Sequence, residues 1–235
     1  MNDFAAPITA VPFDLYRDIH KAIRVVMFDV TAEAGRLDPM DRVARRRHAL
    51  RVQELVRLLQ FHALHEDEHI EAAVRQVLPQ RASEIVADHS ALEARMNDLV
   101  AVANLVLDET RQDQRAAMHR LYLDLASFVS AYLTHQDLEE RVVMPALWNS
   151  HGIEALLGIH NTIIGGISSE DMAWALSMML PAMNNDDRTE LLGGMKADAP
   201  AEVFEALSQL AAQVLCVEDY ATVSGRIGAT LSSVG

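Results

Sequence analysis

The feature that most constrains this chain is a short pattern that occurs twice. Residues 62–67 read His-Ala-Leu-His-Glu-Asp and residues 135–140 read His-Gln-Asp-Leu-Glu-Glu, so each copy is H-x-x-x-E followed by a second acid. Residues four positions apart lie on the same face of an α-helix, about 6 Å apart along its axis. Each copy therefore places an imidazole beside a carboxylate if both segments are helical.

The residues around both pairs give them an apolar setting. Leu55 and Leu59 lie near the helical stripe of the first pair, and Phe128 and Tyr132 flank the second pair in the same way. Both pairs should therefore point into the protein interior, where charge is costly unless it is paired or bound to a metal. Two carboxylates and two imidazoles in one apolar interior indicate a bound cation.

Long helices dominate the first two thirds of the chain. Ala, Leu, Met, Glu and Arg are plentiful, and no alternating apolar run bounded by turn residues suggests a strand. We expect helices over residues 13–34, 39–77, 81–107 and 113–143, with a break near residues 47–51 and ends at Gly35 and near Pro145. Because the connections are short, neighbouring helices should be antiparallel. The prediction is an all-α, up-down-up-down four-helix bundle.

After residue 150 the helices become shorter. We expect them over residues 153–167, 171–183, 187–195, 201–215 and 218–227. The predicted organisation is an N-terminal arm over residues 1–12, the bundle over 13–150, and a C-terminal helical extension over 151–235.

Two further histidines, His20 and His89, fall near the middle of the two remaining long helices. Counted from the expected helix ends, all four lie at the same depth within about a turn. The predicted metal ligands are therefore His20, His62, Glu66, His89, His135 and Glu139. Four neutral imidazoles and two carboxylates suit two divalent ions, with iron the best match. We expect the carboxylates to bridge the two ions, with water, an oxo group or an external ligand completing the coordination.

The pattern H…HxxxE…H…HxxxE resembles the hemerythrin-like, or HHE cation-binding, proteins over about residues 13–147, in particular their bacterial members. The resemblance implies a four-helix bundle with an oxo- or hydroxo-bridged, non-haem di-iron centre that binds O2 or NO, senses oxygen or iron, or handles peroxide. The chain departs from the oxygen-carrying hemerythrins at two positions. Glu93 stands where those proteins have a histidine, and residue 140 is Glu where they have Asp. These departures argue against oxygen transport.

Several side chains near the predicted ligands are candidates for supporting roles: Glu93, His69, Glu140, Tyr16 and Tyr132. Glu93 lies four residues after His89 and can accept a hydrogen bond from a ligand imidazole. His69 lies only about 20° around the helix from His62. Tyr16 and Tyr132 each precede a ligand histidine by one turn, where they can pack in the core or donate a hydrogen bond to a bound ligand.

Two of the predicted carboxylate ligands, Glu66 and Glu139, have alternative interpretations. Residues 65–69 read H-E-x-x-H, in which Glu66 would be the general base of a zinc peptidase rather than a metal ligand. That hypothesis needs a third zinc ligand and a substrate cleft, and it leaves the repeat at residue 135 unexplained. On the fourth helix, Glu139 and Glu140 compete for the carboxylate position.

Net charge, cysteine count and hydropathy indicate which partners and which compartment the protein has. A net charge of −14 disfavours a nucleic-acid partner, because phosphates would be repelled. The single cysteine, the absence of signal-peptide features and the lack of a long apolar run favour a cytoplasmic protein with no membrane span. We expect a di-iron protein that binds or reacts with O2, NO or H2O2, and the sequence does not decide whether it is an enzyme. The alternative is a non-catalytic iron-binding or signalling module whose C-terminal helices contact a partner or form a homodimer.

Overall fold

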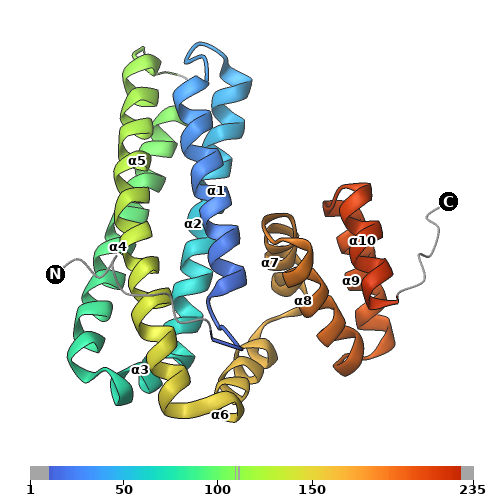
Figure 1. The fold of residues 1–235 in the computed structure, drawn as a ribbon. Helices are drawn as coiled ribbons and strands as arrows, with labels where there is room; N and C mark the ends of the chain where they lie inside the picture. Colours follow the sequence, from blue (N-terminus) through green and yellow to red (C-terminus); the bar gives the residue numbers. More distant parts are fainter. Residues whose placement is uncertain (1–10, 109, 111, 229–235) are drawn as a thin grey trace. The chain divides into compact units, whose positions relative to one another are not determined.

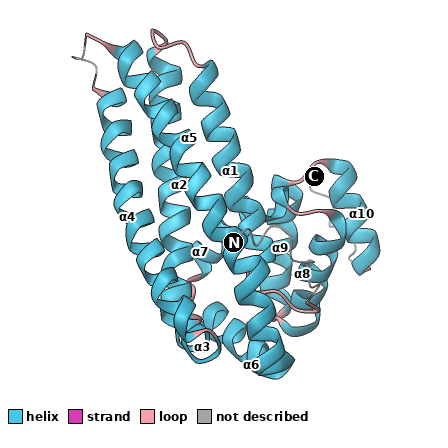
Figure 2. Ribbon diagram, turned by 60° about the vertical axis from the view of Figure 1, so that its left-hand side comes forward, coloured by secondary structure: helices cyan, strands magenta, loops and turns pink. Residues whose placement is uncertain are grey.

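The computed structural model of the chain describes residues 11–108, 110 and 112–228. Most of the expected N-terminal arm lies outside these residues. Within them the chain forms helices and loops and no strand (Figure 2). The all-α fold class is therefore confirmed.

Four long helices build the bundle: α1 (Arg17–Arg36), α2 (Arg42–His69), α4 (Pro79–Leu107) and α5 (Gln114–Leu138). Helix α1 packs against α2 and α5, and α4 packs against the same two helices, so the four form a closed ring of antiparallel neighbours (Figure 1). The bundle interior is filled by fully buried apolar side chains: Ile23, Met27, Leu55, Leu59, Leu99, Leu121, Leu125 and Phe128.

The second bundle helix is continuous where a break was expected. Helix α2 runs through residues 47–51 because its inner face stays buried there, with His48, Ala49 and Val52 all inaccessible to solvent. The His48 ring also lies 3.2 Å from a carboxylate oxygen of Glu33 on α1. The break comes instead at Ile70, after which α3 (Glu71–Val77) begins.

The first bundle helix also differs from its expected bounds. Helix α1 begins at Arg17, where the Asp14 carboxylate accepts hydrogen bonds from the backbone N–H groups of Tyr16 and Arg17. Gly35 lies inside α1, and a Cβ at this position would come 3.1 Å from the Tyr122 ring on α5. The glycine therefore serves close packing between two helices rather than helix termination.

The chain does not end its fourth long helix near Pro145. Helix α5 continues into a π-helical turn, η2 (Glu139–Val143), and then into α6 (Met144–Gly166), which is kinked at Gly152 with a φ of 71°. Proline lacks the N–H that would bond four residues back, and its ring crowds that carbonyl. In the widened turn the N–H of Met144 reaches the carbonyl of Glu139, five residues back. Such turns are frequent at functional sites.

The chain divides into two compact units, one ending at Gly166 and the other beginning at Ile167. Residue 150, where we expected the boundary, lies within α6. The second unit contains α7 (Ser169–Ala182), α8 (Asn185–Asp198), α9 (Ala201–Val214) and α10 (Val217–Ile227). It has its own small core, formed by Leu180, Leu192, Ala211, Leu215 and Val223.

Candidate metal centre

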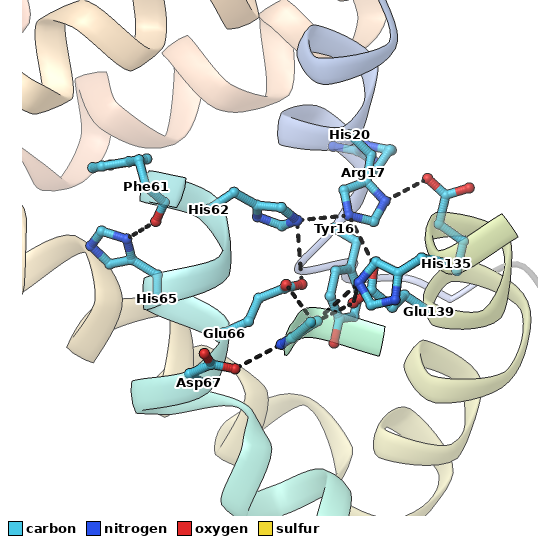
Figure 3. A network of polar contacts seen from close by, with 12 residues as sticks. Tyr16, Arg17, His20, Phe61, His62, His65, Glu66, Asp67, His135 and Glu139 are labelled. Carbon is cyan, nitrogen blue, oxygen red and sulfur yellow. Dashed lines mark hydrogen bonds and ion pairs between the residues drawn. The ribbon is translucent and has the colours of Figure 1, made fainter. Parts of the chain in front are cut away.

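Six side chains from the bundle helices converge in its interior (Figure 3). They are the predicted set: His20 from α1, His62 and Glu66 from α2, His89 from α4, His135 from α5, and Glu139 at the start of η2. Five of the six are at most 6% exposed. The two H-x-x-x-E pairs face inward because each occupies the buried stripe of its helix.

One half of the cluster gathers around His20 and His62. Their Nε2 atoms lie 3.0 Å apart. The Nε2 of His62 lies 3.4 Å from Oε1 of Glu66, and the Nε2 of His20 lies 3.4 Å from Oε2 of Glu139. These four donor atoms all lie within 4.8 Å of one another.

The other half gathers around His89 and His135, whose Nε2 atoms lie 3.1 Å apart. The Nε2 of His135 lies 3.0 Å from Oε1 of Glu139, and the Nε2 of His89 lies 3.6 Å from Oε2 of Glu66. Each carboxylate therefore turns one oxygen toward each half. The two groups of donors share both carboxylates and no histidine.

The chemistry of these donors fits a pair of metal ions. Oε1 of Glu66 and Oε2 of Glu139 are buried acceptor atoms without a hydrogen-bond partner, which is costly unless something else satisfies them. Two imidazole nitrogens about 3 Å apart share at most one proton, but they suit neighbouring positions on one ion, since metal–nitrogen distances are about 2 Å. Imidazole and carboxylate together suit iron and related divalent metals.

The second acid of each repeat holds a histidine from a neighbouring helix. Glu140, which follows Glu139, accepts a hydrogen bond from Nδ1 of His20 at 2.9 Å. Asp67, which follows Glu66, lies 2.7 Å from Nδ1 of His89 and accepts in the same way. With Nδ1 protonated, the Nε2 lone pair of each ring points into the cluster, the arrangement found when histidine binds a metal.

The two outer carboxylates have different surroundings. Arg24 binds both oxygens of Glu140, at 2.6 and 2.9 Å. Burial alone would raise the pKa of Glu140, but hydrogen bonds from His20 and Arg24 outweigh it and lower the pKa to about 2. The Asp67 side chain, in contrast, is 50% exposed. The acceptor for His89 is thus Asp67 and not Glu93, which is exposed.

The charges inside the cluster are strongly coupled. Burial, and then the negative charge of Glu139, raises the pKa of Glu66 well above its usual value. Burial would also raise the pKa of Glu139, but the contacts with His135, His89 and His20 hold it well below the usual value. Burial lowers the pKa of His62, which favours the neutral imidazole that binds metals. A cation between the two carboxylates would remove the repulsion that acts on Glu66.

Two buried tyrosines stand beside the cluster. The Tyr16 ring centroid lies 5.2 Å from that of His20, and the Tyr132 centroid lies 5.9 Å from that of His135. Burial, and then the charges of Glu66 and Glu139, raises the pKa of both phenols, so both hydroxyls keep their protons. The structure thus gives each half of the cluster one neighbouring aromatic ring with a potential hydrogen-bond donor.

The H-E-x-x-H residues do not form a site of their own. Nδ1 of His65 lies 2.7 Å from the carbonyl oxygen of Phe61, and the ring points away from Glu66 (Figure 3). His69 is 21% exposed and contacts Glu68, with 3.7 Å between Nε2 and a carboxylate oxygen. Within the described part of the chain, neither histidine belongs to a group of donors that could hold an ion.

Two residues beside the cluster were not predicted from the sequence: Asp67, which contacts His89, and Arg24, which contacts Glu140. Asp67 carried a visible signal, because it occupies the same place in the first repeat as Glu140 in the second. Arg24 lies one turn after His20 and carried no signal, since its partner Glu140 is 116 residues away in sequence.

Fold and cluster together define a four-helix-bundle protein with a histidine–carboxylate centre for metal ions. The family model of the hemerythrin HHE cation-binding domain matches residues 11–147, more than half of the chain. The chain therefore belongs to the hemerythrin HHE cation-binding family, which implies that it binds metal. A search of curated proteins and a search of solved structures each found no match. Among the described residues, no helix is both long enough and apolar enough to cross a membrane.

Proposed function

We propose that the cluster holds two iron ions and that the loaded centre binds a small ligand of the class O2, NO or H2O2. His20 and His62 would hold one ion, His89 and His135 the other, and Glu66 and Glu139 would bridge them. The observation that carries this proposal is that two groups of donors share both carboxylates, with one oxygen turned toward each half.

Paired iron ions supply electron transfer and coordination positions that the protein leaves open. The chain's own contribution is to fix the ligands and exclude bulk water. Glu140 and Asp67 orient His20 and His89, and the apolar bundle core surrounds the centre. Tyr16 and Tyr132 remain protonated and can donate hydrogen bonds toward a bound ligand. The H-E-x-x-H hypothesis lacks support, because Glu66 faces His62 and His89 rather than His65.

The test is the metal content of the protein and its visible absorption. The unaltered chain should bind about two irons and show ferric absorption that NO or azide changes. Glu66→Ala and Glu139→Ala should each lose the bridging ligand and with it most of the iron. Glu68→Ala is the matched control, because Glu68 lies on the same helix with its side chain 57% exposed. Full iron content in both bridging variants would refute the proposal.

A further inference from the structure

Two cavities adjoin the metal centre, and both lie against the same half of it. The larger has a volume of about 470 Å³ and opens between α2 and α4, with Tyr132 and His135 of α5 at its inner end. The smaller, about 20 Å³, has room for one water-sized molecule and lies toward α3. Both are lined by His89 and Glu66. Neither is lined by His20 or His62.

The two halves also differ in burial, because His20 is fully buried whereas His89 is partly exposed. The outer nitrogen of His20 is closed off by Glu140 and Arg24. The His89 side chain is 13% exposed, and its outer partner Asp67 is 50% exposed. A molecule arriving from solvent can therefore approach the His89–His135 half without displacing a packed helix.

Glu66 links the larger cavity to the metal-binding chemistry. Its side chain lines the cavity and is only 6% exposed, and its Oε2 atom lies 3.6 Å from the Nε2 atom of His89. The cavity therefore reaches the carboxylate oxygen that faces the His89–His135 half, where a buried charge calls for a bound cation.

The charged side chains that line the larger cavity are mainly acids. Besides Glu66, its described lining residues include the acids Asp67, Glu71 and Glu93 and no lysine or arginine, although Glu71 is paired with Arg75 outside the lining. A cleft lined by one sign of charge attracts ions of the opposite sign and repels ions of the same sign, whereas neutral molecules pass unaffected. The walls also include Leu92 and Met96, and the volume falls in the range of pockets for small organic ligands.

We infer that this cavity is the ligand pocket of the metal centre, that it serves the His89–His135 half, and that it admits neutral or cationic molecules in preference to anions. Its size accommodates a small organic molecule as well as a diatomic. The inference rests on the proposed function, because it assumes that the centre is loaded with metal.

The route is tested by filling the pocket from two opposite walls. Ser90→Trp on α4 and Leu64→Trp on α2 place a bulky ring at lining positions whose side chains are exposed, so folding should be preserved. In the iron-loaded chain, both should slow the association of NO by about tenfold or more. Val25→Trp is the control, since Val25 is an exposed residue of α1 that does not line the cavity.

The charge selection is tested with azide as the anionic probe and NO as the neutral one. Glu93→Lys should strengthen azide binding by roughly tenfold at low ionic strength and leave NO binding unchanged. Asp98→Lys is the charge-matched control, because Asp98 is exposed on the same helix outside the cavity lining.

The outcomes separate the two proposals. Wild-type NO association in both iron-loaded tryptophan variants would overturn the route, and equal azide affinity in Glu93→Lys and Asp98→Lys would overturn the charge selection. An unaltered chain that retains no iron would instead refute the proposed function itself. Iron content is measured in every variant, so slow ligand binding is distinguished from a lost centre.

Discussion

At the residue scale, the second acid of each repeat explains how the centre is assembled across helices. In each repeat the first acid faces the cluster, and the acid that follows it reaches the lone histidine of a different helix. Consecutive residues on a helix point about 100° apart, so one H-x-x-x-E-[D/E] segment can serve both purposes. The pattern thus encodes a potential ligand and a support for another ligand together.

We predict that Asp67→Asn weakens metal binding without unfolding the bundle. An asparagine oxygen can still accept the hydrogen bond from His89. It lacks the negative charge that makes the His89 imidazole a stronger metal ligand. Metal affinity should fall by about tenfold, as is typical for partners of ligand histidines. Chelator competition measures it. Asp88→Asn, at an exposed position next to His89, should bind as the unaltered chain does; equal affinities for the two variants would contradict the role of Asp67.

At the element scale, the two helices that carry the repeats begin in the same way. Asp41 starts α2 and its carboxylate accepts the backbone N–H of Ala44, and Asp113 starts α5 and accepts that of Ala116. Such N-caps satisfy amide groups that have no partner within the helix. They also fix where each helix begins, and therefore the depth at which its H-x-x-x-E pair enters the bundle.

Replacing one of these caps should cost a predictable amount of stability. Asp41→Ala should lower the free energy of unfolding by about 1 kcal/mol, whereas Asp41→Asn should remain close to the unaltered chain because asparagine also caps helices. Urea titration followed by circular dichroism measures both. Asp29→Ala, at an exposed position inside α1, controls for the loss of an acid. The N-cap explanation fails if asparagine destabilises as much as alanine.

At the scale of the whole molecule, the candidate metal centre and the C-terminal helices belong to different compact units. All six side chains of the cluster lie in the unit that ends at Gly166, and α3, α6 and the bundle end form a core there that includes Ile70, Val74, Met144 and Leu156. The second unit has a core of its own. A partner-binding or signalling role for residues 167–235 would therefore act on a bundle that is complete without them.

We predict that a chain ending at Gly166 folds and binds as much metal as the full chain. Helix α6 must be kept, because Leu156 is fully buried in the core at the end of the bundle. A chain ending at residue 150 should be less stable, since it exposes that core. Iron content and thermal unfolding of the two shortened chains distinguish them. Loss of iron from the chain ending at Gly166 would show that the second unit supports the centre.

The sequence alone determined the helical class, the bundle and the set of histidines and carboxylates that meet. These follow from local rules, because residues four apart share a helix face and buried charge calls for a partner. Only the tertiary structure decided the break at Ile70, the π-turn before Pro145 and the pairing of Asp67 with His89. It also decided that one half of the centre adjoins a cavity while Arg24 and Glu140 close the other. These features depend on contacts between helices far apart in the chain, which no local pattern specifies.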